Sequence, residues 1–233
     1  DKFCKFCVVP YTRGAEFSRP INELVKEGKD LASNGAKEIT LLGQNVNAYS
    51  YNEKKLSNLI SEMSEIKDIK RIRYTTSHPK DFTEDLIEAH RNNKKKLMPL
   101  IHLPVQSGSN KILKAMNRKH TVEDYLEIIN KLREVSPNIK FSSDFIIGYP
   151  GETENDFNDT LNLLNKIQFI NCYSFIFSPR PGTPAAKLTE IDYNIAKERL
   201  VTFQKIADQI KLKYRRNLFN KSALVLFENR VKN

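Results

Sequence analysis

The sequence predicts an α/β fold built on a parallel sheet. Short apolar segments typical of buried strands alternate with segments of helical periodicity, and successive strands start roughly 30 residues apart, about the length of a βα unit. The loops after the predicted strands are polar, and several contain glycine. Ligands of α/β proteins bind at such carboxyl-end loops, so we expect a functional site where the strands end.

The first half of the chain contains three of the expected strands. Helices are expected at 20–34, 56–66 and 84–92, and strands at 39–42, 69–74 and 100–103. Ser18 can cap the first helix and Gly35 follows its end, while apolar residues recur at helical spacing in the first two helices. Thr83 has the side chain of an N-cap before the third. Each strand is a short apolar run, as a buried parallel sheet requires.

The second half of the chain continues the alternation. Helices are expected at 110–116, 122–133, 153–166 and 193–217, strands at 141–147 and 172–177, and the start of a new strand at 222–227. Thr153 is followed three residues later by Asp156, which is close to a capping box. Asp144 interrupts an otherwise apolar strand. Because a buried carboxylate needs a polar partner, Asp144 is a candidate functional residue.

Composition sets wide limits on function. The 233 residues include 38 Lys and Arg against 28 Asp and Glu, a formal net charge of +10. This charge favours a polyanionic partner such as a nucleic acid, although solvated lysines alone would give the same balance. Basic and apolar residues alternate over 197–221, as on one basic face of a packed helix. No apolar run approaches the roughly 18 residues that span a bilayer, so no membrane association is expected.

Cys4 and Cys7 are the strongest candidates for metal ligands. Their Cys-x-x-Cys spacing allows two thiolates to share one metal centre, but a zinc site or a cubane cluster needs further ligands. A cysteine immediately before Asp1 would supply a third. Two other interpretations stay open: both cysteines are small buried residues, or they form a redox dithiol. A redox dithiol normally opens a helix, whereas Val8-Val9-Pro10 follows here.

Cysteine usage also bears on the compartment. Cys172 has no cysteine near it in the sequence and is expected to lie in the core. Three cysteines, one of them distant, do not make a disulfide framework, which favours a reducing cytoplasm.

Three polar residues near predicted strand ends form a second candidate group. Gln106, Arg118 and Asp144 would converge on the carboxyl-end face of the sheet. There, Gln and Asp side chains can hydrogen-bond ribose hydroxyls and Arg can pair with the carboxylate of a zwitterionic nucleoside. Alternatively, Arg118 is solvated and the other two satisfy loop backbone. The four histidines lack ligand spacing and are expected to be structural or solvent-facing, with His78 and His102 nearest to strand ends.

Several stretches of the chain resemble one protein family. They are 3–14 with 18–20, 41–49, 102–109, 116–121, 144–153 and 178–186. Through them nearly the whole chain resembles the radical S-adenosylmethionine (SAM) methylthiotransferases. The loop 43–47 and the stretch 11–14 are similar to the tRNA-modifying branch of that family.

The resemblance implies where two cofactors would bind. Cys4 and Cys7 would be two of the three ligands of a [4Fe-4S] cluster, with the third cysteine just before Asp1. Phe6 would lie near the adenine of SAM. The remaining SAM-binding residues implied by the resemblance are Gly43, Gln44 and Asn45 at the methionine end, and Gln106, Arg118 and Asp144. The last three align with SAM-holding positions in a more distant relative, oxygen-independent coproporphyrinogen oxidase.

The resemblance also implies a reaction and its partners. SAM would be cleaved reductively to a 5′-deoxyadenosyl radical, and a methylthio group would enter at carbon two of an isopentenylated adenosine beside the anticodon of tRNA. The enzyme would act as a monomer on a tRNA anticodon stem-loop, with Arg13 and Arg19 contacting the substrate. An electron donor such as flavodoxin or ferredoxin would supply the electron.

The expected fold class follows from the same resemblance. Residues 1–221 would form a partial (β/α)6 radical-SAM TIM-type barrel whose first strand precedes the cysteine loop, which leaves an open sheet edge. Residues 222–233 would begin a C-terminal TRAM-type β-barrel that binds RNA. A second, auxiliary [4Fe-4S] cluster would belong to an N-terminal domain outside this chain, so the chain alone is expected to be inactive.

Two other functions stay open. The chain could be an RNA-binding remnant without cluster or catalysis, using its basic helix alone. It could also be a metal-free barrel that binds phosphate esters at the strand ends.

Overall fold

Five parallel strands form the centre of the molecule, as predicted. The structure is a computed structural model and describes residues 2–75 and 77–227. The strands are β1 (Glu38–Leu41), β4 (Arg71–Tyr74), β5 (Leu100–His102), β6 (Lys140–Ile147) and β7 (Asn171–Ile176). β1 pairs with β4, and β5, β6 and β7 pair in that order, all in parallel. The α/β fold with a parallel sheet is therefore confirmed.

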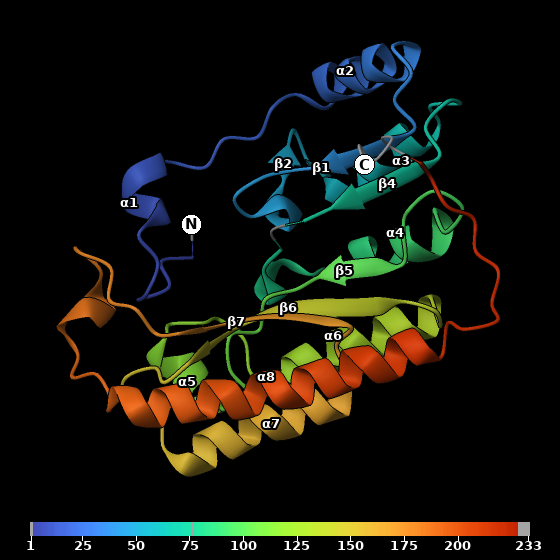
Figure 1. Ribbon diagram of the computed structural model, residues 1–233. Helices are drawn as coiled ribbons and strands as arrows, with labels where there is room; N and C mark the ends of the chain where they lie inside the picture. The colour runs from blue at the N-terminus through green and yellow to red at the C-terminus, as the bar shows by residue number, and fades with distance from the viewer. Residues whose placement is uncertain (1, 76, 228–233) are drawn as a thin grey trace, which may run out of the picture.

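A short bridge joins the two parts of the sheet. Ile72 of β4 bridges Leu97 in parallel, just before β5 begins. The Ile72 N–H donates to Lys96 O at 2.8 Å, and the Met98 N–H donates to Ile72 O at 3.0 Å. The strands consequently follow one another across the sheet in chain order, with the carboxyl ends all at one edge, as in a barrel opened along one side (Figure 1).

The main helices lie between successive strands in the chain, except that α2 precedes β1 and α8 follows β7. They are α2 (Ile21–Ser33), α3 (Leu56–Ser64), α4 (Glu84–Asn92), α5 (Asn110–Ala115), α6 (Val122–Val135), α7 (Glu154–Ile167) and α8 (Tyr193–Arg216). The capping box predicted at Thr153 and Asp156 is formed, and Thr121 with Asp124 makes another before α6. No described helix is both long enough and apolar enough to cross a membrane.

Helices α6, α7 and α8 cover the same face of β6 and β7 (Figure 1). On this face the Phe145 ring of β6 lies 4.7 Å from Phe203 of α8 and 5.6 Å from Phe169, and all three side chains are fully buried. Cys172 packs against the same core from β7, as predicted. Packing of this apolar layer fixes the strands, whose ends then position the site.

A short helix and a small hairpin were not predicted. Helix α1 (Val9–Arg13) follows the cysteines directly, and β2 (Ser50–Tyr51) with β3 (Lys54–Lys55) forms a small hairpin. The expectation that Val8-Val9-Pro10 would prevent a helix was wrong. Pro10 occupies the first turn of α1, where a missing N–H breaks no intrahelical hydrogen bond and the fixed φ suits the helix.

The strand predicted at 222–227 is not formed. These residues follow α8 without secondary structure, and Leu224 is 93% exposed. The Leu224 carbonyl accepts a hydrogen bond from Arg71 Nη2 at 2.9 Å, and no strand among the described residues pairs beside this segment. A single apolar run does not make a strand where no neighbour supplies ladder hydrogen bonds. Residues 228–233 lie outside the described part.

The predicted basic face of the last helix is smaller than its composition suggested. Arg199 is buried and pairs with Glu152, whereas Lys197, Lys205, Lys213 and Arg216 are exposed. Arg199 therefore ties α8 to the loop after β6.

Candidate active site

Backbone hydrogen bonds hold the cysteine loop in place. The Cys7 N–H donates to Cys4 O at 3.0 Å, which closes a turn between the two thiols. The Lys5 N–H donates to Met116 O at 2.9 Å, after α5, and Lys5 O accepts from the Ala185 N–H at 3.0 Å. Cys4 is buried and Cys7 half-buried. The loop is thus fixed between two segments that are more than a hundred residues away in the sequence.

Both cysteines border a cavity of about 280 Å³ at the carboxyl ends of the strands. It is lined by Lys2, Phe3, Cys4, Phe6, Cys7, Val9, Pro10, Glu16, Gln44, Asn45, Ser77, His78, Pro104, Gln106, Arg118 and Asp144. Eight of the residues singled out in the sequence are among them: Cys4, Phe6, Cys7, Gln44, Asn45, Gln106, Arg118 and Asp144. Gly43, Arg13 and Arg19 are not. The cavity has the position at which α/β folds bind ligands.

Arg118 links the cysteine loop to the end of β5. Its Nη1 lies 3.6 Å from Cys4 Sγ, and its Nη2 donates to Pro104 O at 2.6 Å. Nε is buried without a hydrogen-bond partner among the described residues. Burial lowers the pKa of Arg118, and the nearby Cys4 sulfur opposes that shift. The guanidinium thus places positive charge beside a sulfur that would bind a metal as a thiolate.

Gln106 and Asp144 lie on neighbouring strand ends. Gln106 has a φ of +78°, and its backbone N–H donates to Asp144 O at 2.9 Å. The Asp144 side chain is 33% exposed, and its Oδ1 lies 3.3 Å from His102 Nε2. The expectation of a buried carboxylate was therefore wrong, because Asp144 is on the face of β6 opposite the helices. Its carboxylate is accessible to a ligand.

His78 and Ser77 are site residues that the sequence analysis did not select. His78 Nδ1 accepts a hydrogen bond from the Lys80 N–H at 3.1 Å, so the ring proton is on Nε2. That Nε2 and Ser77 Oγ are buried without a partner in residues 2–75 and 77–227. Burial, with a contribution from Arg118, lowers the pKa of His78 to about 2, so the ring is neutral. The only sequence signal was the position of His78 in the exit loop of β4.

Asn45 has a similar unpartnered atom. Its Nδ2 donates to Asp81 Oδ2 at 2.6 Å, and Asp81 Oδ1 accepts from Lys2 Nζ at the same distance. The Asn45 Oδ1, however, is buried without a partner within the described chain. Unpartnered buried polar atoms are rare in proteins, and four of the seven found in the described residues belong to side chains that line this cavity. This arrangement is typical of a site that a polar ligand completes.

Comparison with known proteins identifies the family. The family model described as the radical SAM superfamily matches residues 1–164. The chain belongs to the radical SAM superfamily. Among curated relatives, the tRNA-2-methylthio-N(6)-dimethylallyladenosine synthase of Pelagibacter ubique is 57% identical over 100% of this chain, and that of Wolbachia pipientis (subspecies Culex pipiens) is 53% identical over 99%. The chain covers 53% of each, so it spans about half the length of the curated relatives it matches.

Solved structures show the same fold at low sequence identity. The radical SAM methyltransferase TsrM from Kitasatospora setae, solved with cobalamin and a [4Fe-4S] cluster bound, gives a TM-score of 0.64 at 18% identity, covering 78% of this chain and 36% of that one. Coproporphyrinogen III oxidase (HemN) from Escherichia coli gives 0.62 at 14% identity, covering 89% and 50%. These likenesses support the partial-barrel fold; the β-barrel after residue 221 is supported by none of them.

Radical SAM proteins use a [4Fe-4S] cluster and SAM, and the residues that line the cavity suit both. Two thiols on one turn beside Arg118 suit two cluster positions, since such clusters are held by cysteine thiolates. No group of three or more His, Cys, Asp and Glu side chains that could hold a metal occurs in the described residues, so these two thiols form only part of a ligand set. The unpartnered donors of Arg118, His78 and Ser77 suit a polar zwitterion such as SAM.

The two arginines predicted to contact substrate border a second cavity. Arg13, Arg19 and Gly43 line a space of about 350 Å³ next to α1. Arg19 Nη1 pairs with Glu27 Oε2 at 2.7 Å, and both side chains are exposed. An exposed pair of this kind is held by little free energy, so Arg19 is free to exchange its partner for another anion.

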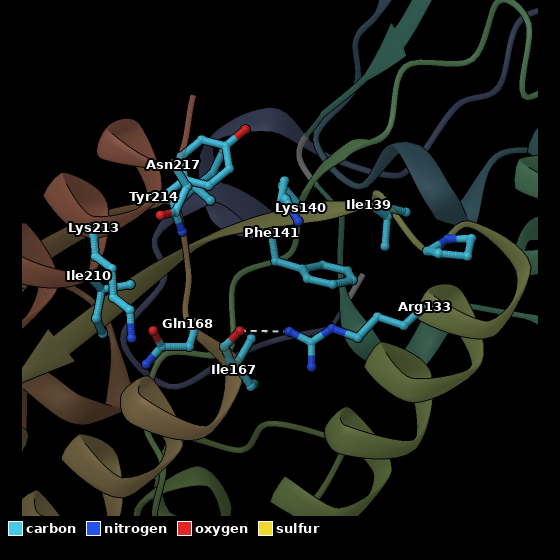
Figure 2. A pocket seen from close by; sticks show the side chains of 12 residues that line it. Arg133, Ile139, Lys140, Phe141, Ile167, Gln168, Ile210, Lys213, Tyr214 and Asn217 are labelled. Carbon is cyan, nitrogen blue, oxygen red and sulfur yellow. Dashed lines mark hydrogen bonds between the residues drawn. The ribbon is translucent and has the colours of Figure 1, made fainter. Parts of the chain in front are cut away.

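A third cavity lies at the opposite end of the strands. Figure 2 shows Arg133, Lys140, Phe141 and Tyr214 around it, with Arg133 Nη2 donating to Ile167 O at 2.7 Å. Its volume is about 200 Å³. Since ligands of radical SAM and other α/β folds bind at the carboxyl ends of the strands, this amino-end cavity is not part of the active site.

Proposed function

We propose that this chain is the catalytic barrel of a tRNA methylthiotransferase that modifies carbon two of a dimethylallylated adenosine beside the anticodon. The observation that carries the proposal is the 57% identity, over the whole chain, to a tRNA-2-methylthio-N(6)-dimethylallyladenosine synthase. The aligned region covers the whole chain and therefore includes the segments that line the cavity. The bound cluster and SAM would supply the one-electron chemistry that activates the adenine C–H bond.

The residues of the cavity have distinct roles in this proposal. Cys4 and Cys7 bind iron, and the Arg118 guanidinium, whose Nη1 lies 3.6 Å from Cys4 Sγ, places positive charge beside the Cys4 ligand. Phe6 contacts the adenine of SAM. The other residues that hydrogen-bond SAM are Gly43, Gln44, Asn45, Gln106 and Asp144, with Arg118 also available to the carboxylate.

The partners follow from the same proposal. Arg13 and Arg19 contact phosphates of a tRNA anticodon stem-loop, and a flavodoxin or ferredoxin supplies the electron to a monomeric enzyme. The auxiliary cluster belongs to the part of the protein outside this chain. The assignment of residues 1–221 to the barrel and of 222–233 to the start of an RNA-binding domain stays a prediction.

The proposal is tested by nucleoside analysis of tRNA. The native protein that contains this chain is incubated anaerobically with hypomodified tRNA, SAM and reductant, and digested nucleosides are analysed by mass spectrometry. We expect a methylthio mass gain on the dimethylallylated adenosine, lost in Cys4→Ala and kept in Cys172→Ala. An iron-free protein that binds tRNA without any mass gain would instead support the RNA-binding alternative, which the exposed lysines of α8 favour.

A further inference from the structure

The face of β6 and β7 that the helices leave uncovered carries an ordered set of side chains. In the parallel register, Asp144 is opposite Tyr173 and Ile146 is opposite Phe175. Residues alternate between the faces of a strand, and Phe145 between them packs on α8. Asp144, Ile146, Tyr173 and Phe175 therefore share the other face, which we call the open face (Figure 1 shows all three helices on the opposite side).

Two large aromatic side chains of the open face are exposed. Tyr173 is 51% and Phe175 61% exposed, although both belong to a regular strand. A pair of exposed aromatic rings two residues apart forms a contiguous apolar surface, which soluble proteins retain mainly where something binds. The open face is thus a candidate binding surface. It adjoins the cofactor cavity, because Asp144 belongs to the open face and also lines that cavity.

The open face has a polar layer and an apolar layer. In the first, the Tyr173 ring lies 5.9 Å from the His102 ring at an interplanar angle of 75°, and His102 Nε2 lies 3.3 Å from Asp144 Oδ1. In the second, Phe175 is paired with Ile146, which packs against the same small buried cluster as Phe6 of the cysteine loop. The apolar layer is two residues closer to the carboxyl end of the sheet.

A polar layer beside an apolar layer suits an unpaired adenine that carries a hydrocarbon arm. Unpaired RNA bases bind by stacking on aromatic side chains while polar groups contact their edges, and a hydrocarbon arm gains free energy from apolar contact. The formal charge of +10 complements the phosphates of an RNA. We propose that the open face binds the target nucleotide, with Tyr173 stacked on the adenine and Phe175 with Ile146 packed against its dimethylallyl arm. This inference rests on the proposed function and adds the residues that select its substrate.

The test compares two RNAs on the same set of proteins. The native protein is titrated, by fluorescence anisotropy, with an anticodon stem-loop containing dimethylallyladenosine and with the same stem-loop containing adenosine. We expect wild-type protein to bind the dimethylallylated RNA at least tenfold more tightly, as contact with one apolar arm allows. Phe175→Ala should reduce this ratio to near one, and Phe175→Leu, which keeps apolar bulk, should retain most of it.

Two further variants separate stacking from arm recognition. Tyr173→Ala should weaken the binding of both RNAs by about tenfold and leave the ratio of their affinities unchanged, because stacking does not depend on the arm. Phe219→Ala removes an aromatic ring outside the open face that is even more exposed (75%), and it should change the affinity for neither RNA. Circular dichroism confirms that each variant is folded.

The outcomes distinguish this inference from the function on which it rests. The inference is overturned if wild-type protein prefers the dimethylallylated RNA and folded Phe175→Ala keeps the full preference. In that case the open face does not hold the arm, which is the result expected if another part of the protein covers this face. If wild-type protein shows no preference between the RNAs, the proposed substrate itself is wrong.

Discussion

The buried ion pair between Glu152 and Arg199 is expected to be the most stabilising single interaction between α8 and the loop that follows β6. Arg199 Nη1 lies 3.0 Å from Glu152 Oε1, and the two side chains are 10% and 1% exposed. The same Oε1 accepts from the Gly148 N–H at 3.1 Å, in the turn that leaves β6. Replacing Arg199 by Met keeps most of the apolar stem but leaves the Glu152 carboxylate buried without its cation.

The expected loss of stability is large. At 3.0 Å, Coulomb's law with an effective dielectric constant of about 20 gives roughly 5 kcal/mol for the pair. Breaking a buried pair by removing one partner costs about 3–5 kcal/mol in measured cases. We therefore expect Arg199→Met to lower the free energy of unfolding by about 3–5 kcal/mol, and the melting temperature by roughly 10 °C for a chain of this size.

The loss should depend on pH in a defined direction. Burial raises the pKa of Glu152, although Gly148 and Arg199 act against that shift. Without Arg199 the pKa of Glu152 rises further, so folding favours the protonated carboxyl. The loss of stability caused by Arg199→Met therefore shrinks as the pH falls through the folded-state pKa of Glu152. Urea unfolding at pH 7.5 and pH 5 should therefore show a smaller difference between wild type and variant at pH 5.

The control is an ion pair of similar length on the surface. Arg19 pairs with Glu27 at 2.7 Å with both side chains about half exposed, so Arg19→Met should change stability by about 0.5 kcal/mol or less. A cost below about 1 kcal/mol for Arg199→Met, or a penalty that grows at pH 5, would refute the reasoning.

Three more substitutions test other parts of the structure. Gly108→Ala would place a Cβ 2.5 Å from the backbone oxygen of Asp159, so the loop that leads into α5 must move. We expect the free energy of unfolding, measured in urea, to fall by at least about 2 kcal/mol. Asp156→Asn weakens the 2.7 Å contact with Lys111 and should lower the free energy of unfolding by about 1–3 kcal/mol at pH 7. Burial acts to raise the Asp156 pKa, but hydrogen bonds from Lys111, Thr153 and Ser109 outweigh it and lower that pKa. The stability difference between wild type and variant should therefore vanish as acid protonates the wild-type carboxylate. His78→Phe removes the unpartnered Nε2–H donor and should weaken SAM binding in equilibrium dialysis about tenfold, with an unchanged affinity arguing against His78 as a ligand contact.

Periodicity was sufficient to predict the sheet and its main helices. All five parallel strands lie within a few residues of their expected positions, because buried strands and amphipathic helices have patterns that depend only on local sequence. Helix α1 was missed because its five residues are too few to show helical periodicity, and Pro10 fits its first turn. The strand at 222–227 was wrong because an apolar run cannot show whether a neighbouring strand is available.

The candidate site was predictable as a set of residues and not as a geometry. The loops at the strand ends pointed to Gln106, Arg118 and Asp144, and the structure places them around one cavity with Cys4. The contact between Arg118 and Cys4 spans 114 positions of sequence and has no local signal. The same is true of His78, whose role depends on a ring nitrogen left without a partner in three dimensions.

Iron binding by Cys4 and Cys7 is the central claim, and the most direct test is anaerobic iron and sulfide reconstitution of the native protein, read by electron paramagnetic resonance with and without SAM. The comparison uses wild type, Cys4→Ala, Cys7→Ala and the matched variant Cys172→Ala. We expect wild type and Cys172→Ala to give a reduced-cluster signal that changes on addition of SAM, and neither Cys4→Ala nor Cys7→Ala to give that SAM-dependent change. A SAM-responsive signal that survives in Cys4→Ala and Cys7→Ala, or its absence from wild type, would contradict the assignment of these cysteines to the cluster.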